Sequence, residues 1–249
     1  MVTPPTLSRR LFAEFLGTGL LVTVMVGAGF AAQTLSPDNP GLQLLEISSA
    51  CGIGLGIIIL IFGPVSGGHF NPCVSLADWF LGMRSGTGLS IPDLGAYVVA
   101  QCAGGICGAL LANAMYSGGM HISTAHRASG GHLLGEVVAT AGLVSVAFCL
   151  GRSNRAALSP AVGVYLAAAF WFTSSTAFAN PAVTLGRVFT SAITGIAPGS
   201  VLGFILMQLI GAAVAVGIVM VLYPHPAGTS DDLLVPHPAD RVVESSNPS

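Results

Sequence analysis

Six long apolar stretches, separated by short polar segments, dominate the hydropathy pattern of the chain. They cover about residues 11–32, 43–63, 94–116, 133–151, 157–173 and 200–222. Each comes close to the roughly 20 apolar residues that an α-helix needs to cross a bilayer. The pattern therefore predicts an all-α membrane protein with six transmembrane helices.

Two further segments, residues 64–90 and 174–199, are too apolar for solvated loops, and each contains an Asn-Pro pair. Asn is a preferred helix N-cap, and Pro is favoured at the first helical position because its missing N–H would be unpaired there anyway. Asn71-Pro72 and Asn180-Pro181 therefore each predict the start of a re-entrant half-helix. A half-helix of about ten residues spans roughly 15 Å, which is half of a hydrocarbon core.

The two halves of the chain resemble each other, which predicts an internal repeat over residues 11–116 and 133–223. The motif Asn71-Pro72-x-Val74-Ser75-Leu76 matches Asn180-Pro181-x-Val183-Thr184-Leu185, and the sequence around Glu14 matches that around Glu136. Each half has three spans, and an odd number inverts the second copy across the membrane. The two half-helices would then enter from opposite sides, with their N-termini facing each other at the centre.

Composition agrees with a membrane location and bears on partners. Hydrophobic residues make up 53% of the chain and charged residues 7%, with a net charge of −2. Soluble domains carry about 25% charged residues. We therefore expect a lipid bilayer as surroundings and no nucleic-acid partner. We also expect no enzyme activity, cofactor or metal site, because the sequence shows neither a nucleophile–base pair nor a ligand cluster with metal-binding spacing.

The predicted centre has a specific chemistry. Two helix N-termini present partial positive charge, and Asn71 and Asn180 would each hold their amide oxygen on their own helix start, leaving both NH₂ groups as donors in a lumen. The unwound segments 67–70 and 175–179 would expose carbonyl groups, which survive at membrane depth only inside protein or along a water-filled path. Small neutral solutes would find partners along this route, whereas cations would meet two positive helix ends.

At these motifs the chain resembles the aquaporin, or major intrinsic protein, family. The resemblance rests on Ser66-Gly67-Gly68-His69-Phe70-Asn71-Pro72, on Ala13-Glu14-Phe15 with Gly17-Thr18, and on the second Asn-Pro-Ala at residues 180–182. It implies the aquaporin-like fold, with six spans, two half-helices and inverted three-helix repeats. It also implies a homotetramer with one pore per subunit, and pore-lining carbonyls at Gly67, Gly68, His69, Phe178 and Ala179.

The resemblance further implies that Glu14 and Glu136 are buried acids that order the loop carbonyls through hydrogen bonds. Taken alone, each glutamate is also a candidate proton-coupling group. The resemblance covers about residues 9–223 and divides the chain into a cytoplasmic N-terminus (1–10), a channel domain (11–223) and a disordered cytoplasmic tail (224–249). Arginine is concentrated on the side of the N-terminus, so the positive-inside rule places both termini in the cytoplasm of a cell whose plasma membrane the chain spans.

The predicted selectivity filter departs from the family pattern. The family has Arg directly after the second Asn-Pro-Ala, whereas this chain has Val183. By ungapped spacing, the other filter positions are Cys51, Ala168 and Ala177, with Ala169 or Phe172 as alternatives in the fifth span. Such a small, apolar ring predicts a wide filter and resembles a bacterial branch of the family found with arsenic-resistance genes. Arg187 either extends toward the pore mouth or, as we expect, snorkels to the outer interface.

The sequence thus predicts a passive channel for small uncharged solutes: water, glycerol-like polyols and arsenite. Two alternatives stay open. One is a water-selective aquaporin. The other is a secondary active transporter built on inverted repeats, which draws support from Glu14 and Glu136 alone.

Overall fold

The structure, a computed structural model, describes residues 4–83 and 86–223 and contains eight α-helices in these ranges. The predicted tail at 224–249 lies outside the described residues. Six helices are long and apolar enough to cross a membrane, which confirms the prediction. They are α1 (Leu7–Leu35), α2 (Pro40–Ser66), α4 (Ile91–Met115), α5 (Gly130–Ser153), α6 (Arg155–Phe172) and α8 (Pro198–Leu222).

Most of these helices begin up to one turn before the apolar stretch that predicted them, because polar caps set their starts. The side chains of Asn39, Ser90, Ser129 and Asn154 accept hydrogen bonds from backbone N–H groups in the first turns of α2, α4, α5 and α6. Such caps satisfy N–H groups that have no partner inside the helix. A hydropathy window misses these polar first turns.

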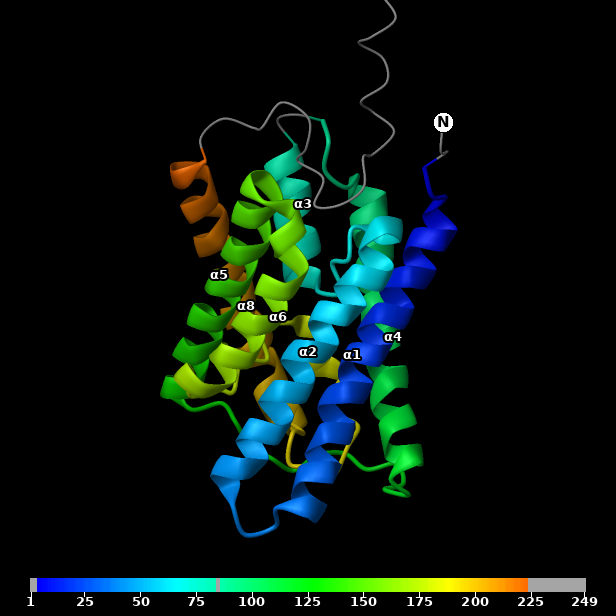
Figure 1. The fold of residues 1–249 in the computed structure, drawn as a ribbon, viewed down its shortest axis with the longest axis vertical. Helices are drawn as coiled ribbons and strands as arrows, with labels where there is room; N and C mark the ends of the chain where they lie inside the picture. The colour runs from blue at the N-terminus through cyan, green and yellow to red at the C-terminus, as the bar shows by residue number, and fades with distance from the viewer. Residues whose placement is uncertain (1–3, 84–85, 224–249) are drawn as a thin grey trace, which may run out of the picture.

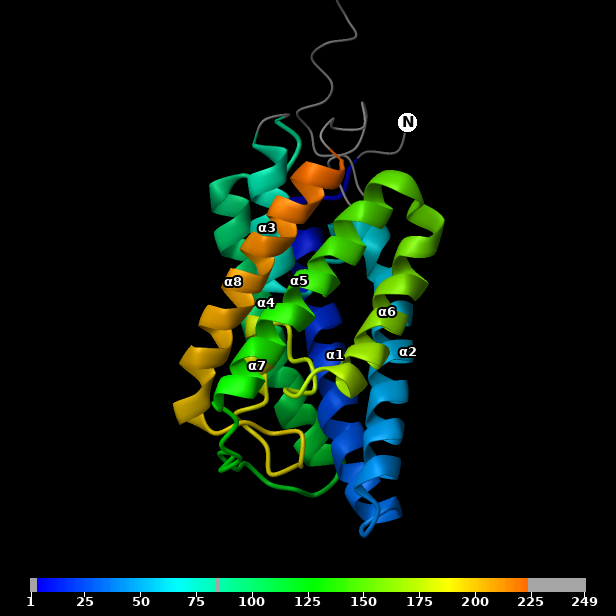
Figure 2. The same ribbon diagram turned by 90° about the vertical axis from the view of Figure 1, so that its left-hand side faces the viewer.

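The six long helices run side by side along the long axis of the molecule (Figures 1 and 2). The N-terminus and the α5–α6 junction lie at one end, here called the proximal end. The α1–α2 junction and the α4–α5 loop lie at the other, the distal end (Figure 1). In each half the first and last long helices pack extensively, α1 on α4 and α5 on α8, and α2 packs on α6 between the halves. The chain therefore has the predicted inverted repeat.

Two short helices fill the inside of this bundle. Helix α3 (Pro72–Gly82) has about the predicted length, but α7 (Pro181–Gly186) is shorter than the ten residues expected. After Gly186 the chain tightens, since Val188 and Phe189 donate backbone hydrogen bonds to residues three positions earlier. These bonds are of the 3₁₀ type, which commonly closes a helix C-terminus.

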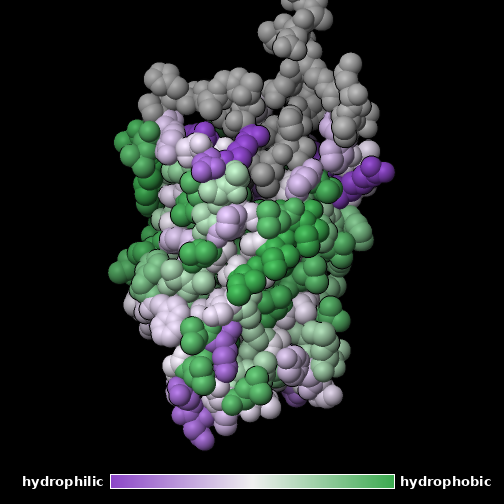
Figure 3. All heavy atoms as spheres, in the orientation of Figure 1, coloured by the Kyte–Doolittle hydropathy of each residue, from purple (hydrophilic) through white to green (hydrophobic). Residues whose placement is uncertain are grey.

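The outward faces of the long helices are apolar. Val99, Val164, Leu202 and Val221 are each more than two-thirds exposed in the single chain. Figure 3 shows hydrophobic residues over the middle of one face and hydrophilic residues mainly toward its two ends. This banding fits a surface that faces lipid or neighbouring subunits.

Close approach of α1 and α4 depends on glycine. A Cβ atom added at Gly108 would overlap the carbonyl oxygen of Gly19, and one at Gly104 would overlap the carbonyl oxygen of Phe15. Small residues at such contacts let helix backbones approach closely in a membrane.

We expect Gly108→Ala to destabilise the protein although alanine favours helices. Overpacking of a tight contact costs about 1–3 kcal/mol. Gly217 in α8 is the matched control, because a Cβ atom there meets nothing within 4 Å. Thermal unfolding in detergent should show a lower Tm for Gly108→Ala and an unchanged or higher Tm for Gly217→Ala. Equal Tm values for the two variants would contradict this account of the α1–α4 contact.

Candidate functional site

The two half-helices begin at the predicted asparagines, inside the bundle. The Asn71 side-chain oxygen accepts a hydrogen bond from the Cys73 N–H at 2.9 Å. The Asn180 oxygen accepts from the N–H groups of Ala182 and Val183, at 2.9 and 3.3 Å. Both asparagines are extended and almost completely buried. Each therefore caps its own helix, as the sequence predicts.

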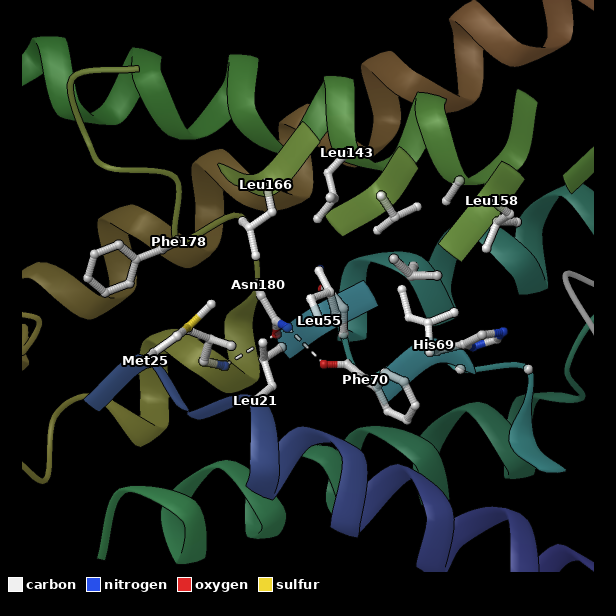
Figure 4. A pocket seen from close by; sticks show the side chains of 18 residues that line it. Leu21, Met25, Leu55, His69, Phe70, Leu143, Leu158, Leu166, Phe178 and Asn180 are labelled. Carbon is white, nitrogen blue, oxygen red and sulfur yellow. Dashed lines mark hydrogen bonds between the residues drawn. The ribbon is translucent and has the colours of Figure 1, made fainter. Parts of the chain in front are cut away.

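The amide nitrogens of the two asparagines join the two repeats. Asn71 Nδ2 donates to the carbonyl oxygen of Ala179, and Asn180 Nδ2 donates to that of Phe70, each at 2.8 Å. Figure 4 shows the second of these bonds. The expectation that both NH₂ groups point freely into a lumen therefore needs correction. Each NH₂ carries two hydrogens, so one N–H per asparagine remains for another partner.

The segments before the two asparagines have an unusual backbone. Phe70, Ala177 and Ala179 have φ values of 50°, 47° and 48°, and Gly67 and Gly68 also have positive φ. Left-handed geometry is uncommon for residues other than glycine and persists only when the surroundings enforce it. These segments therefore need outside support.

Glu14 supplies that support in the first repeat. Its carboxylate accepts hydrogen bonds from Ser66 Oγ (2.6 Å), His69 N–H (3.0 Å), Phe70 N–H (2.6 Å) and Gln101 Nε2 (2.7 Å), and its exposed fraction is 0%. Backbone N–H groups can only donate. Four donors around one carboxyl group favour its ionised form over its protonated form, which argues against the proton-coupling alternative.

Glu136 has the same role in the second repeat. It accepts hydrogen bonds from the N–H groups of Phe178 (3.0 Å) and Ala179 (2.9 Å) and from Gln208 Nε2 (2.6 Å). Its exposed fraction is also 0%. These contacts support the predicted role of both glutamates in ordering the unwound segments.

A narrow cavity of about 40 Å³ surrounds the asparagines. Here it is called the central cavity. Its polar side comes from the unwound segments and includes Gly67, Gly68, His69, Asn71, Phe178 and Asn180. Ala179, a predicted carbonyl position, is not among the described lining residues, and its carbonyl faces Asn71 instead.

The rest of the central cavity is an apolar wall that the sequence analysis did not identify. It consists of Leu21, Met25, Leu55, Ile59, Val74, Leu143, Ala147, Leu158, Val162 and Leu166, several of which are labelled in Figure 4. Many of these residues follow one another at a spacing of four, which marks one face of a helix. That signal is present in the sequence, but lipid-facing residues are equally apolar and hide it.

The predicted filter residues differ in burial and in the cavities that they line. Val183 is fully buried and lines the central cavity, whereas Cys51 and Ala177 are fully buried but line neither of the two pore cavities described here. The prediction for Ala168 is wrong, since this residue is exposed on the outside of α6. At about 100° per residue, it lies on the opposite face from Leu166, which lines the cavity. The ungapped spacing that predicted Ala168 therefore selected a residue on the wrong face of α6.

The two alternative filter residues of the fifth span differ in burial. Ala169 is fully buried, and Phe172 is 56% exposed. Phe170, which the sequence did not single out, lines a second cavity of about 140 Å³ near the distal end, here called the distal cavity.

Arg187 also lines the distal cavity, and the expectation that it snorkels to an interface is wrong. Its exposed fraction is 1%. Its guanidinium carbon lies 3.5 Å from the ring centroid of Phe178, and its Nε donates to the carbonyl oxygen of Thr194. The loop after α7 folds back and holds the side chain inward. Phe178 lines the central cavity, so the Arg187–Phe178 contact links a residue of the distal cavity to one of the central cavity.

Six spans, two opposed half-helices and a cavity with a polar centre define a membrane protein of the aquaporin-like channel fold. The family model described as "Major intrinsic protein" matches residues 1–171. The aquaglyceroporin AqpS of Rhizobium meliloti (strain 1021) is 43% identical over 213 residues, which cover 85% of this chain and 89% of that protein. The chain belongs to the major intrinsic protein family.

Further similarities agree with this assignment. The glycerol uptake facilitator protein of Pseudomonas aeruginosa is 38% identical over 113 residues, which cover 45% of this chain and 38% of that protein. The X-ray structure of the aquaglyceroporin from Plasmodium falciparum matches with a TM-score of 0.61 at 18% identity, covering 88% of this chain and 96% of that one. That structural match shows the shared fold.

Proposed function

We propose that the protein is a passive channel for small uncharged solutes: water, glycerol-like polyols and arsenite. The observation that carries the proposal is the central cavity, where Asn71 and Asn180 place polar groups in an otherwise apolar passage. A neutral hydroxylated solute can exchange hydrogen bonds at this point, and its carbon backbone can contact the apolar wall. A cation would meet two helix N-termini and lose its hydration.

Val183 supports a filter that admits solutes larger than water. It occupies the place directly after Asn-Pro-Ala and offers neither charge nor a hydrogen-bond donor. The names of two similar proteins, an aquaglyceroporin and a glycerol uptake facilitator, point in the same direction.

One observation favours the water-selective alternative. Arg187 and Phe170 line the distal cavity, and Arg187 follows Val183 by four residues, about one helical turn. The guanidinium of Arg187 and the ring of Phe170 would narrow a solute path through the distal cavity. A permissive filter passes glycerol, whereas a water-selective filter excludes it.

The proposal includes an orientation and an assembly. Arg9, Arg10, Arg152 and Arg155 lie toward the proximal end, so the positive-inside rule makes this end cytoplasmic and the distal end external. The bilayer would be the plasma membrane. Exposed apolar side chains on the outward helix faces are compatible with the homotetramer that the family resemblance implies.

Purified protein in proteoliposomes should accelerate swelling in gradients of glycerol and of arsenous acid, relative to protein-free vesicles. Fluxes should be passive and should stop at equal concentrations. Water flux without glycerol flux would contradict the permissive filter and favour the water-selective alternative. Accumulation against a gradient that an uncoupler abolishes would instead establish a secondary transporter.

A further inference from the structure

The distal cavity contains two arginines that the channel function does not explain. Arg127, from the α4–α5 loop, and Arg187, after α7, both line it, together with Gln43, Thr176 and Thr194. Among the described residues, its lining contains no Asp or Glu. The cavity therefore combines positive charge with neutral hydrogen-bonding groups.

The two arginines are held close together around one aromatic ring. Their guanidinium carbons lie 5.4 Å (Arg127) and 3.5 Å (Arg187) from the centroid of Phe178. Arg127 donates from Nε to the carbonyl oxygen of Gly195 at 2.7 Å and from Nη2 to that of Ile193 at 2.6 Å. Backbone carbonyls thus fix the positions of both cations but do not neutralise them.

Arg187 retains unused donor capacity. Its Nη1 is buried and has no hydrogen-bond partner among the described residues. The carboxylate of Glu136 attracts both guanidinium groups electrostatically, but it accepts its hydrogen bonds from Phe178, Ala179 and Gln208. Burial also lowers the pKa of Arg127, as expected for a cation removed from water. A buried charged donor without a partner is costly, and an anion would satisfy it.

We propose that the distal cavity binds a small oxyanion, such as a carboxylate or inorganic phosphate, and that the bound anion blocks the entry of neutral solutes. Planar guanidinium groups match the geometry of oxyanions and form short, charge-assisted hydrogen bonds with them. Thr194 lines the same cavity, and its buried hydroxyl has no hydrogen-bond partner among the described residues, so it offers a further donor.

The anion stays in the distal cavity because the central cavity is unfavourable for a charged group. The central cavity has an apolar wall, and burying a charge among such side chains without pairing carries a large energetic cost. The site lies against Phe178, which lines the central cavity. An occupied site therefore stops a neutral solute before it reaches Asn180. The blocking effect rests on the proposed channel function, whereas the binding does not.

Two measurements separate these parts. Calorimetry of the purified full chain with inorganic phosphate should show saturable binding, with chloride at equal ionic strength as the control. Phosphate should also slow glycerol-driven swelling over the same concentration range. Arg187→Gln should weaken phosphate binding at least about tenfold, the loss expected for a strong charge-assisted hydrogen bond.

Further variants guard against misfolding of the Arg187 variant. Arg187→Lys keeps the charge but lacks the planar fork and should bind with intermediate affinity. Arg127→Gln tests the second cation, and Arg9→Gln, an exposed position at the proximal end, should behave as the unmodified protein.

Binding that is absent, matched by chloride, or unchanged in both the Arg127 and Arg187 variants overturns the site. Uptake of labelled phosphate through the channel overturns the block. Phosphate binding without any basal glycerol flux supports the site and contradicts the proposed function instead.

Discussion

Replacement of Glu14 by leucine is expected to abolish the folded, conducting channel. The carboxylate is the acceptor for two backbone N–H groups, one hydroxyl and one amide, all buried. Each buried donor left without a partner costs about 1–3 kcal/mol. Together these losses approach the about 5–15 kcal/mol that stabilises a typical folded protein.

Thermal unfolding in detergent and glycerol-driven swelling would measure this effect. Glu46→Leu is the matched control, because Glu46 accepts a single hydrogen bond, from Ser36 Oγ, and lies nearer the distal end of α2. Glu14→Gln should fall between the two, since one carbonyl oxygen can serve only part of the donor set. Glu136→Leu should resemble Glu14→Leu, because Glu136 likewise accepts hydrogen bonds from two backbone N–H groups and a glutamine amide. A Glu14→Leu protein with an unchanged Tm and full glycerol flux would disprove the supporting role.

Introduction of arginine at Val183 is expected to reduce glycerol flux before water flux. Val183 is fully buried and lines the central cavity, so a longer side chain there projects into the proposed path. A tenfold decrease in glycerol permeability corresponds to an added barrier of about 1.4 kcal/mol. Water needs less room and can hydrogen-bond to the guanidinium, so its permeability should decrease less.

Stopped-flow swelling with water and glycerol gradients measures both permeabilities on the same vesicles. Val183→Met controls for side-chain length without charge and should affect glycerol less than Val183→Arg does. Combining Val183→Arg with Arg187→Met moves the positive charge one helical turn inward and tests which level sets the selectivity. Equal losses of water and glycerol in Val183→Arg would indicate a blocked or misfolded pore. Unaltered glycerol flux would show that the constriction lies elsewhere, and Arg187 would be the first residue to examine.

The spans and the two helix starts were predictable because each depends on local sequence. A run of apolar residues cannot remain in water, and Asn-Pro specifies an N-cap followed by a first helical residue. The internal repeat also showed that Glu14 and Glu136 occupy equivalent positions in the two halves of the chain. None of these inferences needed distances between segments far apart in the chain.

The details of the site depend on such distances, and there the sequence was insufficient. That Asn71 donates to Ala179 depends on how closely two half-helices approach, which no spacing reveals. Ala168 was misplaced because the repeats differ in register, and all faces of α6 are apolar enough to hide the error. Arg187 was expected at an interface because the loop that encloses it has no sequence signature.

The reciprocal asparagine bonds also constrain the order in which the molecule can be completed. Chains are synthesised from the N-terminus, and Asn71 precedes its acceptor, Ala179, by 108 residues. The first repeat therefore enters the membrane before the group that will hold its half-helix has been made. The carbonyl group of Phe70 is likewise synthesised before its hydrogen-bond donor, Asn180. The pore centre is thus among the last parts of the protein to form during biosynthesis, and a chain interrupted between the repeats has half of each contact and neither bond.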